Sequence, residues 1–87
     1  MKVTQKPSKT GKREYGEIRR ALLRGLAGGQ RNINELATTS KVNWRTTRNH
    51  MIYLVGSSYA RMIFSSPQVK IYEITENGME ALARKRI

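Results

Sequence analysis

The segment 43–55 carries hydrogen-bonding side chains at helical spacing and contains no acidic residue. At about 100° of rotation per residue, Arg45, Arg48 and Asn49 fall on one face together with Ile52. An arginine can donate two parallel hydrogen bonds to guanine, and an asparagine can pair in the same bidentate way with adenine. The opposite face is predicted to join the core and comprises Thr47, Met51 and Leu54. The pattern therefore predicts a helix that is held by one face and contacts DNA bases or backbone with the other.

Trp44 stands at the N-terminal flank of this helix and is counted with the base-contacting residues. Its indole either packs on a sugar-phosphate or a thymine methyl group, or shields the junction between this helix and the preceding one. Further residues are predicted to contact the DNA backbone, because they flank the helix or the later hairpin or lie in the basic N-terminal segment: Lys12, Arg13, Arg31, Lys41, Asn43, Thr46, Arg61 and Lys70.

Residues that could carry out catalysis or bind a metal ion are few and scattered in this sequence. The chain has no cysteine, one histidine and six scattered carboxylates, so no catalytic constellation or metal-ligand spacing can be assembled. No cofactor site or small-molecule pocket is legible, and His50 is interpreted as a packed or partly exposed imidazole at the flank of the core. An enzyme is therefore the least favoured class.

The elements that position the long helix are predicted from the spacing of apolar residues and from the glycine and capping residues at the ends of each segment. A first helix begins at Glu14, with an apolar stripe of Tyr15, Ile18, Leu22 and Leu26, and ends at Gly28–Gly29. A short extended piece at 31–33 precedes Asn34, which is predicted to cap a brief helix over 35–39. Asn43 is predicted to cap the longer helix over 44–55, which Gly56 ends. Two helices with a short gap, the second longer, are typical of a helix-turn-helix.

Two β-rich runs, 60–64 and 69–74, flank a serine-proline turn and predict a hairpin in which Tyr72 and Ile74 share the buried face. Thr75 is predicted to cap a last helix that turns Met79 and Leu82 inward. The element order is then helix, strand, helix, helix, strand, strand, helix. This order predicts an α+β fold of the winged helix-turn-helix type, with the hairpin as the wing.

Charge and length set the organisation. The 87 residues include 17 lysines and arginines against 6 acids, a formal net charge of +11 that attracts polyanions. Residues 1–13 are expected to form a disordered basic arm, acting either on DNA phosphates or only as a solubilising tail, and residues 14–87 one winged-helix domain. With no apolar run long enough for a bilayer and no signal peptide, the chain is expected in the cytoplasm, or in the host cytoplasm if a virus encodes it.

Three stretches together resemble the archaeal winged-helix transcription regulators, including small ones encoded by archaeal viruses and plasmids. They are 33–37, 42–54 and 72–82, the last carrying a tyrosine, then threonine and glycine, ahead of a leucine-bearing helix. The resemblance implies a homodimer on a palindromic or semi-palindromic site, joined through the first and last helices. Leu23 lies off the main stripe and is interpreted either as a semi-exposed leucine or as a dimer contact. Lys41 and Ser58 replace family glycines, so a non-glycine is expected to take an adjusted backbone conformation at Lys41 and the wing to depart at a different angle after Ser58.

Three functions remain open at this point. The leading one is a sequence-specific regulator of transcription that binds double-stranded DNA. The second is an architectural protein that coats or bends DNA without sequence preference, which the basic arm favours. The third is a winged-helix protein-interaction module whose outer face meets an acidic partner.

Overall fold

The computed structural model describes residues 15–84 and contains the predicted elements in the predicted order. They are α2 (Tyr15–Ala27), β1 (Arg31–Asn32), α3 (Ile33–Ser40), α4 (Trp44–Gly56), β2 (Ala60–Ser65), β3 (Lys70–Ile74) and α5 (Glu76–Arg84). The basic segment 1–13, with Lys12 and Arg13, lies outside the described residues. No helix within 15–84 is long and apolar enough to cross a membrane.

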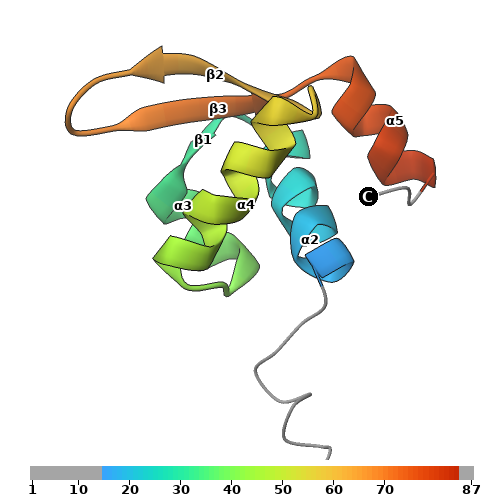
Figure 1. The fold of residues 1–87 in the computed structure, drawn as a ribbon, viewed down its shortest axis with the longest axis horizontal. Helices are drawn as coiled ribbons and strands as arrows, with labels where there is room; N and C mark the ends of the chain where they lie inside the picture. The colour runs from blue at the N-terminus through green and yellow to red at the C-terminus, as the bar shows by residue number, and fades with distance from the viewer. Residues whose placement is uncertain (1–14, 85–87) are drawn as a thin grey trace, which may run out of the picture.

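The three strands form one antiparallel sheet in the order β1-β3-β2. Figure 1 shows this sheet along one side of the molecule, with α2, α3 and α4 beneath it and α5 at one end. The β2–β3 hairpin extends past the helices as a wing (Figure 1). Helices α3 and α4 form the helix-turn-helix, so the arrangement is an α+β winged helix-turn-helix.

Helix α2 lies at the centre of the packing, in contact with α3, α4, α5 and β3. Because neighbours cover it on more than one side, its buried arc is wider than a single stripe and includes Leu22, Leu23 and Leu26. Leu23 is 0% exposed. The interpretation of Leu23 as a semi-exposed residue or a surface dimer contact is therefore wrong. Tyr15, expected on the buried stripe, is instead 67% exposed because it lies in the first turn, beyond the core.

The start of α3 differs from the prediction by two residues. Asn32, not Asn34, is the N-cap: its side-chain oxygen accepts from the Glu35 backbone N–H at 2.8 Å. The Glu35 carboxylate accepts in return from the Asn32 backbone N–H at 2.9 Å, completing a capping box. Helix α3 therefore begins at Ile33, whose side chain is buried, and the exposed Asn34 is left outside the cap. The reciprocal bond favours Asn32 because Glu35 stands three positions after it.

Both helices of the helix-turn-helix end through a left-handed residue that is not glycine. Lys41 has φ 59° after α3, and Ser58 has φ 68° after α4. The backbone N–H groups of Lys41 and Val42 bond to carbonyls of α3, and those of Ser58 and Tyr59 bond to carbonyls of α4 in the same pattern. This is the Schellman arrangement, in which the residue in the left-handed conformation is usually glycine. The adjusted conformation expected at Lys41 is thus confirmed, and Ser58 shares it at the start of the wing.

Helix α5 approaches the sheet through small residues. Thr75 caps it as predicted, with its hydroxyl accepting from the Gly78 N–H at 3.0 Å. The buried residues of α5 are Gly78 and Ala81, with Leu82 partly buried against the core. Met79 is 51% exposed, so the prediction that it faces inward is wrong. The face with the smaller side chains packs inward because it permits a closer approach to the chain leading into β2.

A bulge changes which side chains of the wing face the helices. Met62 pairs with the buried Tyr72, whereas Phe64 pairs with Ile71, and the register shifts between Met62 and Phe64. Cross-strand partners share a face and neighbours alternate, so Met62 lies on the helix side while Phe64 lies on the open side. Tyr72 is buried and Ile74 packs against the core, which confirms that these two share the inner face.

Candidate nucleic-acid interface

Helix α4 is anchored through one face. Thr47, Met51 and Leu54 are each 0% exposed, as their spacing predicts. The helix starts at the predicted cap, where the Asn43 side chain accepts from the Thr46 backbone N–H at 2.8 Å. These contacts fix the rotation of α4 about its axis, so its remaining face must point away from the core.

The opposite face of α4 presents the predicted DNA-contacting side chains to solvent. Arg45, Arg48 and Asn49 are all exposed, and Ile52 is 59% exposed. Trp44 is 51% exposed at the first residue of the helix, so half of its surface is free to meet a ligand. No acidic residue lies on α4 to offset the two arginines.

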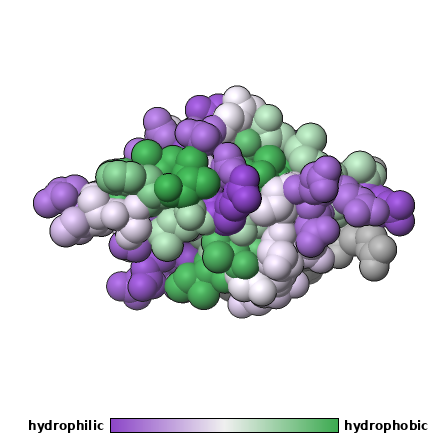
Figure 2. Space-filling view, turned by 90° about the horizontal axis from the view of Figure 1, so that it is seen from above, coloured by the Kyte–Doolittle hydropathy of each residue, from purple (hydrophilic) through white to green (hydrophobic). Residues whose placement is uncertain are grey.

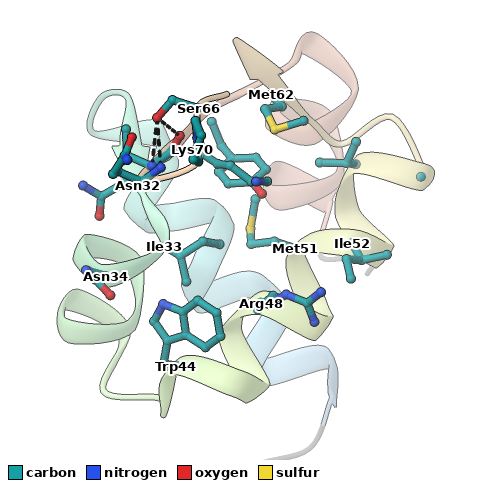
Figure 3. Close-up of a pocket in the computed structure, with 16 residues that line it drawn as sticks. Asn32, Ile33, Asn34, Trp44, Arg48, Met51, Ile52, Met62, Ser66 and Lys70 are labelled. Carbon is teal, nitrogen blue, oxygen red and sulfur yellow. Dashed lines mark hydrogen bonds between the residues drawn. The ribbon is translucent and has the colours of Figure 1, made fainter. Parts of the chain in front are cut away.

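A groove of about 580 Å³ separates α4 from the wing (Figure 3). Trp44, Ile52 and Met62 stand around it, with Ile33 and Met51 closer to the core (Figure 3). The charged side chains among its lining residues are Arg48 and Lys70, both cationic. The groove thus combines apolar walls with positive charge. The groove could not be predicted from the sequence, because its walls come from segments far apart in the chain and only the hairpin pairing brings Met62 towards α4.

The wing turn is held by its own side chains. The Ser66 hydroxyl accepts from the backbone N–H groups of Gln68 and Val69 at 3.2 and 3.0 Å, drawn as dashed lines in Figure 3. Lys70, predicted as a backbone contact, is exposed beside the groove. Arg61 forms an ion pair with Glu73 on the neighbouring strand, its Nε lying 2.6 Å from the carboxylate, while its side chain remains 68% exposed. This pairing offsets the Arg61 charge.

The other predicted backbone contacts lie around the helix-turn-helix. Arg31 is half-buried, and its Nε donates to the Gly25 carbonyl at 3.3 Å, so part of its guanidinium serves the end of α2. Lys41 is exposed in the left-handed turn directly before α4. Asn43 and Thr46 form the cap of α4. Lys41, Asn43 and Thr46 are therefore brought together at the N-terminal end of α4, whereas Arg31 lies apart at the start of α3.

A second cluster joins α2 to α4 beside this interface and consists of Tyr15, Arg19, His50 and Tyr53. The Arg19 guanidinium lies 3.6 Å from the centre of the Tyr53 ring and 5.4 Å from that of Tyr15. Its Nε donates to Nδ1 of His50 at 3.2 Å. His50 is 7% exposed, in agreement with the predicted packed imidazole. Burial, and then the Arg19 charge, lower the pKa of His50, so the neutral acceptor form is favoured.

Arg19 was not among the residues predicted to form a site. The four-residue interval from Tyr15 to Arg19 was a signal, since it places both on one helix face. The contact with α4 required the tertiary packing. Among residues 15–84, no group of three or more His, Cys, Asp or Glu side chains forms a candidate metal site.

Apolar side chains also lie on the open side of the wing. Ile63 and Phe64 are 40% and 51% exposed, and Ile71, which pairs with Phe64, is half-buried. Figure 2 looks onto this side and shows hydrophobic surface gathered over the hairpin. The wing thus carries apolar surface on both sides, with Met62 on the groove side.

Comparison with solved structures identifies the fold. The chain is similar to Sso10a-2, a DNA-binding protein from Sulfolobus solfataricus, with a TM-score of 0.75 and 23% identity over 84% of this chain and 75% of that one. It is also similar to the transcriptional regulator BldR from Sulfolobus solfataricus, with a TM-score of 0.70 and 20% identity over 93% of this chain and 58% of that one. The transcriptional repressor CouR, solved on a 23-mer DNA duplex, gives a TM-score of 0.66 and 25% identity over 77% and 49%.

BldR and CouR are transcription regulators and Sso10a-2 is a DNA-binding protein; two of the three come from Sulfolobus solfataricus, which agrees with the resemblance that the sequence indicated. The winged helix-turn-helix fold is thereby confirmed. The chain spans about three quarters of the length of Sso10a-2 but only about half that of CouR. No family model and no curated protein sequence matches the chain.

Proposed function

We propose that this chain is a sequence-specific regulator of transcription that binds double-stranded DNA. Helix α4 enters the major groove, and the wing of β2 and β3 lies on the backbone or in the adjacent minor groove. Arg45, Arg48, Asn49 and Trp44 contact bases. The backbone contacts are the arm residues Lys12 and Arg13 together with Arg31, Lys41, Asn43, Thr46, Arg61 and Lys70.

One observation carries this proposal: α4 is rotationally fixed by fully buried residues, and its exposed face holds two arginines and an asparagine on a helix that contains no acidic residue. A helix-turn-helix presents the N-terminal half of its second helix to base edges, which is where these three side chains lie. The net charge of +11 supplies attraction to phosphate. DNA binding by Sso10a-2 and CouR, proteins of the same fold, supports the same partner.

The test begins with selection of binding sites from random duplexes at near-physiological salt, using the full chain. Arg48→Ala or Asn49→Ala is then expected to cost about 1–3 kcal/mol on the selected duplex and to relax the preference at one base pair. Arg24→Ala is the matched control for Arg48, because it removes the same charge from an exposed position on α2. The control substitution is expected to weaken binding to all duplexes slightly and to the same extent.

Other outcomes favour the alternative functions. Equal affinity for every duplex would identify an architectural DNA-binding protein without sequence preference. A folded chain that binds no duplex at low salt would leave the protein-interaction module. Deletion of residues 1–12 is expected to weaken binding to all sequences alike and to flatten the salt dependence, and an unchanged slope would leave the arm as a solubilising tail.

We propose in addition that the chain acts as a homodimer joined through α2 and α5. These helices pack against each other, and each carries an exposed large side chain, Tyr15 on α2 and Met79 on α5. Light scattering coupled to size exclusion is expected to give twice the chain mass of 10.0 kDa. Replacement of Met79 by Glu is expected to return the monomer mass, and a wild-type monomer at micromolar concentration would contradict the dimer.

A further inference from the structure

An apolar stripe runs through the cationic face of α4. Trp44, Arg48 and Ile52 follow one another at intervals of four residues, so they lie on successive turns of the same helix face. At a rise of about 1.5 Å per residue, the stripe extends over roughly 12 Å. Trp44 is 51% exposed and Ile52 is 59% exposed, on either side of the Arg48 guanidinium. All three line the groove between α4 and the wing (Figure 3).

The composition of this groove matches one kind of occupant. Its apolar walls are formed by Trp44, Ile52, Val55 and Met62, and its charged lining residues are both cations. A second copy of the chain, with a net charge of +11, is repelled by such a surface, whereas a polyanion is attracted. The occupant must therefore combine negative charge with small apolar groups. Duplex DNA meets both requirements, because its major groove exposes the C5-methyl group of thymine beside the phosphate backbone.

We propose that Ile52 and Trp44 read thymine methyl groups on either side of the base that Arg48 contacts. This inference rests on the proposed DNA binding and adds a specificity determinant to it. Arg48 supplies hydrogen bonds, and the two apolar side chains supply contacts that distinguish thymine from cytosine or uracil. Ile52 lies two turns after Trp44, so the thymines are separated by the contacted base rather than adjacent. Burial of one methyl group accounts for about a fourfold change in dissociation constant.

Replacement of thymine by deoxyuridine tests this directly, since it removes the methyl group and leaves the hydrogen-bonding edge unchanged. Starting from a duplex selected by the wild-type chain, each thymine is replaced in turn, and the dissociation constant is measured by fluorescence anisotropy. The affinity of the wild-type chain is expected to fall about fourfold when the thymine at one or two positions is replaced. Ile52→Ala is expected to bind the methylated and unmethylated duplexes alike at one of these positions, and Trp44→Ala at the other.

Arg24→Ala is the control, because Arg24 is also exposed but lies on α2, away from the groove. It is expected to retain the full deoxyuridine effect. Wild-type binding that is insensitive to every deoxyuridine substitution would overturn the inference, and so would an Ile52→Ala variant that retains all of the effect. Failure of wild type to bind any duplex would instead remove the proposed function. Loss of self-association in Ile52→Ala, without a change in methyl sensitivity, would assign the stripe to a second copy.

Discussion

Gly78 offers a direct test of how α5 fixes the base of the wing. It lies in the first half of α5, where the helix meets the chain entering β2. A Cβ added at this position would overlap the Tyr59 carbonyl oxygen and stand 2.7 Å from Cγ1 of Ile74. The same Tyr59 carbonyl accepts a hydrogen bond from the Thr75 N–H at 3.1 Å, so it cannot move without loosening the start of α5.

Two opposing effects set the magnitude for Gly78→Ala. In an open helix, alanine is about 1 kcal/mol more favourable than glycine. Overlap with a closely packed backbone typically costs about 1–3 kcal/mol and occasionally more. Because the clash is with a hydrogen-bonded carbonyl rather than with a flexible side chain, the upper end applies. We therefore expect a net loss of about 2 kcal/mol in the free energy of unfolding.

Urea unfolding followed by far-ultraviolet circular dichroism measures this difference. Gly56→Ala is the matched control, since Gly56 ends α4 and a Cβ there meets nothing within 4 Å. The control is expected to leave stability unchanged or to raise it by up to about 1 kcal/mol. A Gly78→Ala variant as stable as wild type, or more stable, would refute the close approach of α5 to Tyr59.

Three further outcomes are expected. Asn32→Ala should lower the free energy of unfolding by about 1 kcal/mol through loss of the capping box, while Asn34→Ala should change it little. Equal effects of the two substitutions in urea titrations would contradict the assignment of Asn32 as the N-cap. Ser58→Gly should raise the free energy of unfolding by about 0.5–1 kcal/mol, because glycine adopts φ 68° without steric cost, and an unchanged unfolding midpoint would contradict this. Burial, aided by the Arg19 charge, lowers the pKa of His50 from 6.5. The unfolded chain then binds more protons, so stability should fall as the pH drops below about 6.5, and thermal melts of His50→Gln should show a flatter profile there; an identical slope would remove His50 as the cause.

The order of the elements was predictable because each boundary has a local chemical signal. Asn43 before a helical run, Gly28 and Gly29 after one, and the serine-proline turn between two β-rich runs need no tertiary information. The division of α4 into a buried and an exposed face also followed from sequence spacing alone. The roles of Arg45, Arg48 and Asn49 in DNA binding remain predictions.

The misassigned residues depended on contacts between distant segments. Leu23 is buried because α2 has four neighbouring elements, α3, α4, α5 and β3, so its buried arc is wider than a single helical stripe. Met79 is exposed because the close approach of α5 to Tyr59 selects Gly78 and Ala81 for the interface. The cap predicted at Asn34 lies two positions late, because the Glu35 carboxylate accepts from the Asn32 backbone N–H and so selects Asn32 as the cap.

The groove between α4 and the wing was beyond sequence analysis for the same reason. Met62 reaches it because it pairs with the buried Tyr72 on the inner face of the hairpin, whereas the bulge between Met62 and Phe64 turns Phe64 to the open side. The Arg61–Glu73 ion pair likewise depends on the strand register, in which these two residues are direct partners. Periodicity identifies a face of an element, whereas pairing and packing decide what that face meets.

The most direct measurement is the ratio of two dissociation constants for the full chain at near-physiological salt: one for a duplex obtained by selection and one for a shuffled duplex of the same length and composition. A sequence-specific regulator is expected to bind the selected duplex at least about a thousandfold more tightly. Arg48→Ala is expected to reduce that ratio, whereas Arg24→Ala, with the same net charge, should preserve it. A ratio near one for wild type would contradict the central claim that α4 reads DNA sequence.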